Sequence, residues 1–273
     1  MDTKAPATTN FYPTFTVQHI TNPNHFYAFP LLGFLVKVIM LIPQFIELMV
    51  LGIAAFFMVF VINPFVVLFT GTYWNPAYEL YAGMLRLSTK IFLFMYGLTN
   101  KYPGFDFTIS DTFSVEVVKP TKPNRWFAIP LLGGLARIIL LIPFFIYESL
   151  IRYTAYLGMI GASFPVLFVG RYPESSYELA RDSVRLNLSM SMYMSGLSDK
   201  YPSFWISMNH KTIKWILIIL SVLYMLSSFG NGFKNGYYRS KQSQYNMQYR
   251  NRMMQNKMMQ NYNSYPSDLK TGY

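Results

Sequence analysis

The sequence predicts a mainly α-helical integral membrane protein: two tandem kinked helical-hairpin repeats with short extramembrane β-strands, followed by a C-terminal transmembrane helix. Three observations lead to this fold class. Of the 273 residues, 52% are hydrophobic and only 13% are charged, and two apolar runs are each about forty residues long. Soluble domains carry roughly 25% charged residues, so this chain has too little charge to cover a soluble globule. Its abundant apolar side chains also exclude a disordered protein.

The charge and the cysteine content exclude further kinds of functional site. The chain contains no cysteine, which excludes disulfides, thiolate metal sites and cysteine nucleophiles. The formal charge of +11 predicts contact with anionic lipid headgroups. We expect no nucleic-acid partner, because no recognition motif accompanies the charge. Residues 1–30 lack the apolar segment of a signal peptide, so insertion is expected to rely on internal segments.

The chain repeats itself at an offset of about one hundred residues. Leu31-Leu32-Gly33 returns as Leu131-Leu132-Gly133, and Leu41-Ile42-Pro43 returns as Leu141-Ile142-Pro143. Because both copies run in the same order, we expect both to enter the membrane with the same orientation. The predicted divisions are an N-terminal tail (1–12), two membrane repeats (13–110 and 113–209), a transmembrane helix (213–230) and a basic Asn-, Gln-, Tyr- and Met-rich tail (231–273). We expect this tail to be disordered alone and to fold in part on contact with a partner.

The first half of each copy predicts a strand and two helices. Residues 15–20 and 113–118 alternate apolar and polar side chains, which is typical of a half-buried strand. The proline that follows residue 42 or 142 should kink or restart the helix, because it lacks an N–H and clashes with the preceding turn. A short helix is therefore expected over 31–42 or 131–142. A longer spanning helix should then begin after Pro43 or Pro143.

The second half of each copy predicts a turn, a return helix and another strand. Gly, Pro and Asn mark the turn at 71–76 or 170–174. The return helix should cover 77–98 or 176–197, and the charges of the second one predict an amphipathic helix. Residues 105–109 and 204–208 alternate again. We expect these four alternating segments to form a small sheet at the membrane surface.

The repeated phrases also carry a family resemblance. The turn Gly170-Arg171-Tyr172-Pro173 and the closing motifs Lys101-Tyr102-Pro103 and Lys200-Tyr201-Pro202 resemble those of a bacterial membrane family known as domain of unknown function 4389. The resemblance covers about residues 13–209. The first copy departs from it, since Gly71-Thr72-Tyr73-Trp74 lacks the arginine. The resemblance implies a tandem membrane protein of the bacterial inner membrane and brings no activity with it.

Three charged residues fall within the predicted spans. Glu148 and Arg152 are spaced i, i+4 and can pair on one helix face. Glu47 lies in the first span, where the second copy has Tyr147. A charge in hydrocarbon needs a reason, and two interpretations remain open: a structural ion pair that fixes helix packing, or an ion path. The unmatched Glu47 weakens the ion path, because the halves of a repeated transporter are expected to present related polar groups.

Further polar and aromatic residues predict interface contacts. The matched Lys37 and Arg137 are expected to reach lipid headgroups, as are Arg171, Tyr172 and Trp74 in the turns. In the tail, tyrosine and arginine side chains are favoured contact groups at protein interfaces. The expected partner-binding residues of the tail are Arg239, Arg250, Arg252, Tyr245 and Tyr249. The alternative is a tail held loosely near anionic lipid by its charge.

Catalytic patterns are scarce. His19, His25 and His210 do not have metal-ligand spacing, and no nucleotide fingerprint or nucleophile elbow is present. We therefore expect no catalytic, metal or cofactor site. The predicted function is a non-enzymatic structural or accessory subunit of a membrane-protein assembly, whose partners are membrane lipids, other membrane-protein subunits or copies of itself. The alternative is a transporter or channel with a path lined by Glu47, Glu148 and Arg152.

Overall fold

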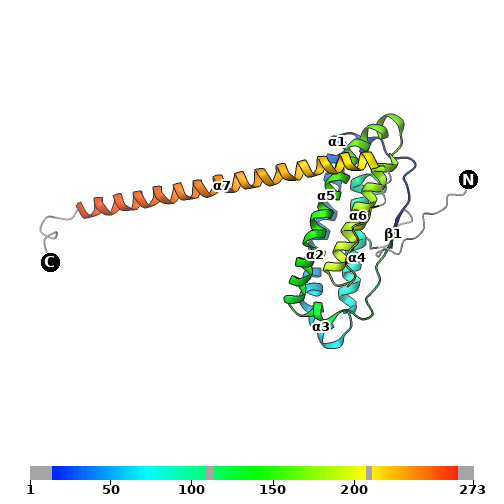
Figure 1. The fold of residues 1–273 in the computed structure, drawn as a ribbon, viewed down its shortest axis with the longest axis horizontal. Coiled ribbons are helices and arrows are strands. Elements are labelled where there is room, and N and C mark those ends of the chain that lie inside the picture. Colours follow the sequence, from blue (N-terminus) through cyan, green and yellow to red (C-terminus); the bar gives the residue numbers. More distant parts are fainter. Residues whose placement is uncertain (1–13, 108–112, 207–210, 264–273) are drawn as a thin grey trace, which may run out of the picture. The chain divides into compact units, whose positions relative to one another are not determined.

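The computed structural model describes residues 14–107, 113–206 and 211–263, which are mostly helical (Figure 1). Two compact units are present, Met1–Ser221 and Val222–Tyr273. Two helical stretches in the described residues are long and apolar enough to cross a membrane, Ile42–Thr70 and Leu132–Val169. These observations bear out the predicted helical class and the two apolar helices.

The first copy contains a strand followed by a broken helix and a return helix. Its elements are β1 (Thr14–Val17), the 3-10 helix η1 (Phe26–Ala28), α1 (Leu32–Met40), α2 (Ile42–Ala55), the π-helix η2 (Phe56–Ile62), α3 (Asn63–Thr70) and α4 (Asn75–Tyr96). The break at Leu41 confirms the helix end expected before Pro43. Pro64 follows η2, and a proline without an N–H disturbs the regular helical bonding of the preceding turn.

The second copy has the same order of parts but an unbroken long helix. Its elements are β2 (Phe113–Glu116), the 3-10 helix η3 (Arg125–Ala128), α5 (Leu132–Val169) and α6 (Glu174–Met194). The predicted break at Pro143 is wrong, because α5 continues through both Pro143 and Pro165. Extensive packing against α6 accompanies this continuity, so tertiary contacts offset the hydrogen bonds that the prolines remove.

Glycines in the left-handed conformation end the long helices where the sequence predicted turns. Gly71 has φ 72° after α3, and Gly170 has φ 68° after α5. Only glycine adopts this conformation without steric cost, which is why it ends so many helices. The return helices α4 and α6 follow and begin two residues before their predicted starts.

The sheet is smaller than predicted. β1 and β2 pair antiparallel, with Phe15 opposite Val115. The expected four-stranded sheet is wrong for the described residues, because 105–107 and 204–206 are not strands. Side chains of the return helices bind these segments instead: Lys90 Nζ donates to Asp106 O at 2.9 Å, and Arg185 donates to Trp205 O at 2.6 Å. Residues 108–109 and 207–208 lie outside the described part.

The two copies run in opposite directions, which corrects the expected common orientation. The Arg125 guanidinium, just before α5, lies against Gly71 at the end of α3. Reciprocally, the His25 ring, just before α1, lies against Gly170 at the end of α5. The antiparallel pairing of the matched strands β1 and β2 imposes this inversion, since each copy begins at one strand and then leads to the opposite end of the bundle.

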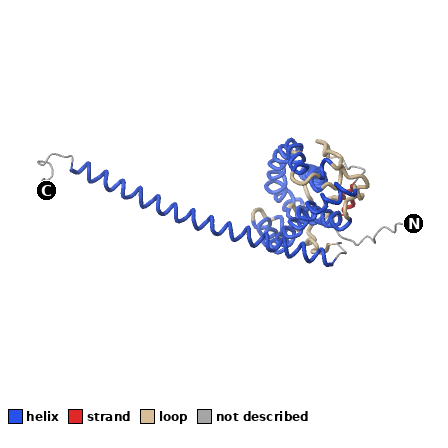
Figure 2. Tube along the Cα trace, turned by 90° about the horizontal axis from the view of Figure 1, so that it is seen from above, coloured by secondary structure: helices blue, strands red, loops and turns tan. Residues whose placement is uncertain are grey.

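The helices of the first unit form layers. Figure 1 shows α2 and α5 on the left, α4 and α6 in the middle, and β1 on the right; Figure 2 shows the strands at the edge of the helices. α4 packs on α2 and on α6, and α6 packs on α5. Large hydrophobic side chains of α2 and α5 are exposed along both helices, whereas none on α4 is. The core therefore lies around α4 and α6.

The last helix, α7 (Lys211–Asn263), contains the predicted helix at 213–230 and continues without a break. The prediction of a disordered tail is wrong for residues 231–263, which are helical; residues 264–273 lie outside the described part. Met, Gln, Lys and Arg, which are frequent from residue 241 onwards, are good helix formers. The side chains of residues 237–259 are all exposed.

Candidate functional site

The candidate site is the junction between the two copies, where the turn of each copy meets the end of the other copy's return helix. Tyr73 OH, from the first turn, donates to Ser195 O after α6 at 3.1 Å. Its match, Tyr172 OH, donates to Tyr96 O at the end of α4 at 2.9 Å. Burial raises the pKa of both phenols, so both hydroxyls keep their protons and act as donors. The junction is thus reciprocal.

The strands add a second reciprocal pair of hydrogen bonds. Tyr78 OH, on α4, donates to Val117 O at 2.8 Å, and the matched Tyr177 OH, on α6, donates to Val17 O. Each return helix is therefore tied to the strand segment of the other copy. Tyr78 and Tyr177 are equivalent residues, because Tyr78-Glu79-Leu80 returns as Tyr177-Glu178-Leu179. The sequence carries no signal that each of them reaches across to the other copy.

A buried cation stands at each end of the junction. Arg137 is 5% exposed and donates to the carbonyls of Tyr193 and Ser198 near the end of α6. It also pairs with the Asp199 carboxylate, and its guanidinium lies 4.7 Å from the centre of the Phe127 ring. A cation is favourable beside the carbonyls that end a helix. Arg137 thus caps α6.

Lys37 occupies the equivalent place in the first copy. Its Nζ donates to Met95 O at 3.4 Å and lies 5.8 Å from the centre of the Tyr27 ring. Burial lowers the pKa of Lys37 to about 8. The expected contact of Lys37 and Arg137 with lipid headgroups does not fit this burial. Both side chains reach inwards because the end of their own return helix offers carbonyl oxygens there.

The predicted headgroup residues of the turns differ in their exposure. Arg171 is exposed, as headgroup contact requires, and Trp74 is half-buried. Tyr172 is buried, and its hydroxyl donates a hydrogen bond to the Tyr96 carbonyl oxygen. The expected headgroup contact therefore does not fit Tyr172. The Trp74 backbone N–H donates to the Asn63 side chain at 2.9 Å, which fixes the turn to the start of α3.

The predicted ion pair on α5 is present. Arg152 donates to the Glu148 carboxylate at 2.7 Å, and the Glu148 side chain is only 1% exposed. Asn187 of α6 lies beside the same carboxylate. Glu47 has different surroundings, since it interacts electrostatically with Lys90, which pairs with Asp106 at 2.7 Å. Among the described residues, Glu47 forms no ion pair with Arg152, so these three charges do not form one cluster.

The structure describes two of the three histidines and all of the expected partner-binding residues of the tail. His25 lies 3.3 Å from Leu167 O, and the His19 ring lies 4.5 Å from the Tyr177 ring; His210 lies outside the described residues. In the described part of the chain, no three His, Asp or Glu side chains are grouped as a metal site requires. The predicted tail residues are all exposed: Arg239, Arg250, Arg252, Tyr245 and Tyr249.

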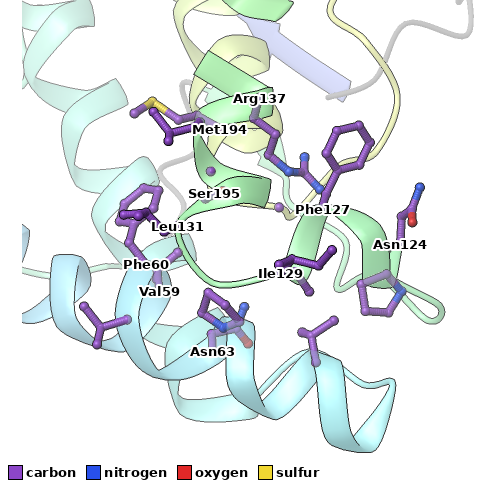
Figure 3. Close-up of a pocket in the computed structure, with 18 of the residues that line it drawn as sticks. Val59, Phe60, Asn63, Asn124, Phe127, Ile129, Leu131, Arg137, Met194 and Ser195 are labelled. Carbon is purple, nitrogen blue, oxygen red and sulfur yellow. The ribbon is translucent and has the colours of Figure 1, made fainter. Parts of the chain in front are cut away.

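An apolar cavity of about 420 Å³ lies beside Arg137 (Figure 3). It is lined by η2 and α3 of the first copy and by η3 and the start of α5 of the second. The cavity at the equivalent place beside Lys37 measures only about 30 Å³. Two local differences accompany the larger cavity. The π-helix η2 lines it, and Gly134 stands where the first copy has Phe34.

Three polar groups beside the cavity already have partners. Arg137 is paired with Asp199, the side-chain Oδ1 of Asn63 accepts from the Trp74 N–H, and the Tyr73 hydroxyl donates to Ser195 O. The cavity volume falls in the range of ligand pockets, about 300–1,000 Å³. Its chemistry therefore suits an uncharged hydrocarbon chain.

Comparison with known proteins adds no relative: no family model, curated protein or solved structure matches the chain. The family resemblance of the sequence motifs remains a prediction.

Proposed function

We propose that the chain is a membrane-embedded, non-enzymatic structural or accessory subunit built of two related repeats. The observation that carries this proposal is the exposure of the two apolar helices. Within Ile42–Thr70, only 11% of the most apolar part is buried. Within Leu132–Val169, the corresponding share is 33%. The core helix of a soluble protein would be mostly buried, and a monomeric soluble protein rarely exposes so large an apolar surface. Lipid or another membrane protein suits these faces.

The arrangement of charges favours a structural role over transport. Three ion pairs join residues of the same copy: Lys90 with Asp106, Arg137 with Asp199, and Glu148 with Arg152. In each pair one member is buried, and a charge is tolerated inside a protein when it is paired. A transporter or channel lined by Glu47, Glu148 and Arg152 would need these groups along one path. The family resemblance supports the same membrane setting, for which we propose the bacterial inner membrane.

We propose that the exposed residues of the tail bind partner subunits. Deleting residues 234–273 should leave the first unit folded and reduce co-purification of stable partners from mild detergent. A triple change to alanine at Tyr245, Tyr249 and Arg250 should reduce partner recovery in the same way. The matched control, a triple change to alanine at Gln242, Gln244 and Gln248, should leave partner recovery unchanged. All six side chains are exposed on α7. Unchanged partner recovery after the deletion would leave lipid contact as the role of the tail.

A second candidate function, binding of a hydrocarbon chain, is favoured by the cavity beside Arg137. A Cβ on Gly134 would meet no atom within 4 Å, so a larger side chain can extend there. Gly134→Phe, which supplies the side chain of the first copy, should lower labelling by a photoactivatable fatty acid about tenfold, or about 1.4 kcal/mol.

The matched control for the cavity is Gly161→Phe. Gly161 lies on the same helix, is exposed and has equally open surroundings, but it does not line the cavity. Peptide mapping of the labelled protein shows where the fatty acid reacts. Labelling that is spread evenly over α2 and α5, or that is equal in both variants, would exclude a specific chain site.

A further inference from the structure

We propose that the first unit lies flat in one leaflet of the membrane, with α2 and α5 parallel to the membrane plane. Their exposed apolar faces then lie in hydrocarbon, and both ends of the bundle face the same aqueous side. This inference rests on the membrane embedding proposed above and gives that embedding a geometry.

The length of the apolar face argues against an upright helix. α5 has 38 residues, which at 1.5 Å per residue is about 57 Å. The hydrocarbon core of a bilayer is only about 30 Å thick, and spanning helices tilt by about 20° on average. Apolar side chains are nevertheless exposed at both ends of α5, from Leu132 (64%) to Phe168 (84%). An upright α5 would push one or both of these ends into water.

The connection between the copies gives an independent reason. α4 ends beside Lys37, whereas η3 lies beside Gly71 at the other end of the bundle. The chain therefore leads from one end of the bundle to the other between α4 and η3, and the described residues of this connection, 97–107 and 113–124, contain no helix. They include Lys101, Lys119 and Lys122. In an upright bundle this charged, irregular backbone would have to cross hydrocarbon, which the bilayer does not tolerate.

The position of the strands indicates which side of the bundle faces water. Figure 1 shows β1 beside the middle of the bundle, separated from α2 and α5 by the layer of α4 and α6. Thr14 and Thr16 of β1 and Ser114 and Glu116 of β2 are exposed. In an upright bundle these polar side chains would lie near the bilayer midplane. In a flat bundle they face water, while α2 and α5 face hydrocarbon.

Cysteine labelling tests this geometry without background, because the natural chain has no cysteine. The test variants are Thr72→Cys and Arg171→Cys, exposed and matched residues of the two turns, and Ser114→Cys on the sheet. Sealed vesicles of known orientation, washed with alkaline carbonate, are treated with a charged maleimide from either side. We expect all three to react from the same side, and at least about tenfold more slowly from the other, because the reagent must then cross hydrocarbon.

The outcomes separate the two proposals. If the carbonate wash releases the chain, the membrane embedding is wrong, and the flat placement fails with it. If the chain stays with the vesicles but Thr72→Cys and Arg171→Cys react from opposite sides, the bundle is upright and only the flat placement is wrong. If Ser114→Cys alone reacts from the other side, a segment crosses the membrane and the flat placement is also wrong. Ile46→Cys, on the exposed apolar face of α2, should resist the reagent from both sides.

Discussion

Replacing Gly133 by alanine will destabilise the protein by about 3 kcal/mol, because forced overpacking in a packed region costs about 1–3 kcal/mol and occasionally more. A Cβ at this position would clash with Phe127 O and lie 2.5 Å from Phe127 C. These are backbone atoms, so no side chain can rotate away to make room. The contact arises because the chain turns sharply between η3 and α5, where Leu131 has φ 65°.

The neighbouring Gly134 is a matched control. A Cβ there would meet no atom within 4 Å, so Gly134→Ala should leave stability unchanged or raise it by up to about 1 kcal/mol through helix propensity. Thermal unfolding of the detergent-purified variants measures the difference. Gly33→Ala, whose Cβ would lie 2.5 Å from Tyr27 O, should behave like Gly133→Ala. Equal melting of Gly133→Ala and Gly134→Ala would mean that η3 does not pack on α5 as described.

Removing Arg152 will destabilise the protein by about 3 kcal/mol, since a buried carboxylate that loses its partner typically costs about 3–5 kcal/mol and Arg152 is partly exposed. The Glu148 side chain is 1% exposed and its charge would remain. Adding Glu148→Ala to Arg152→Ala should therefore recover part of the lost stability. A double-mutant cycle of melting temperatures checks this. If Arg152→Ala, Glu148→Ala and the double variant melt alike while ion flux into liposomes is lost, the transporter interpretation is favoured instead.

Local structure was largely predictable from the sequence. Apolar runs, the proline at 43 and the glycines at 71 and 170 marked the helices and their ends, because these signals act within one or two turns of the chain. Pro143 shows the limit of such rules, since packing on α6 preserves a helix that the local rule would break. The tail shows another limit: its composition suggested disorder, yet its residues are good helix formers.

The junction could not be predicted from the repeat. Matching residues 13–110 to 113–209 reveals two similar units, but the order of copies in a chain does not fix the direction in which they pack. The segment 97–124 is long enough to lead to either end. The same limit applies to Lys37 and Arg137, for which the sequence predicts headgroup contact. The helix pattern shows only a basic residue, whereas the carbonyls that bind it, such as Met95 O and Tyr193 O, belong to a distant part of the chain.

The inverted packing of the two copies is tested most directly by disulfide formation across the strands. Thr14 and Glu116 lie opposite each other on exposed positions of β1 and β2, and only the antiparallel register pairs these two positions. Thr14→Cys with Glu116→Cys should therefore form an intramolecular disulfide on mild oxidation, visible as a faster band on a non-reducing gel. Thr72→Cys with Arg171→Cys, at opposite ends of the bundle, should form none. A disulfide between the two turns, with none between the strands, would contradict the inverted arrangement.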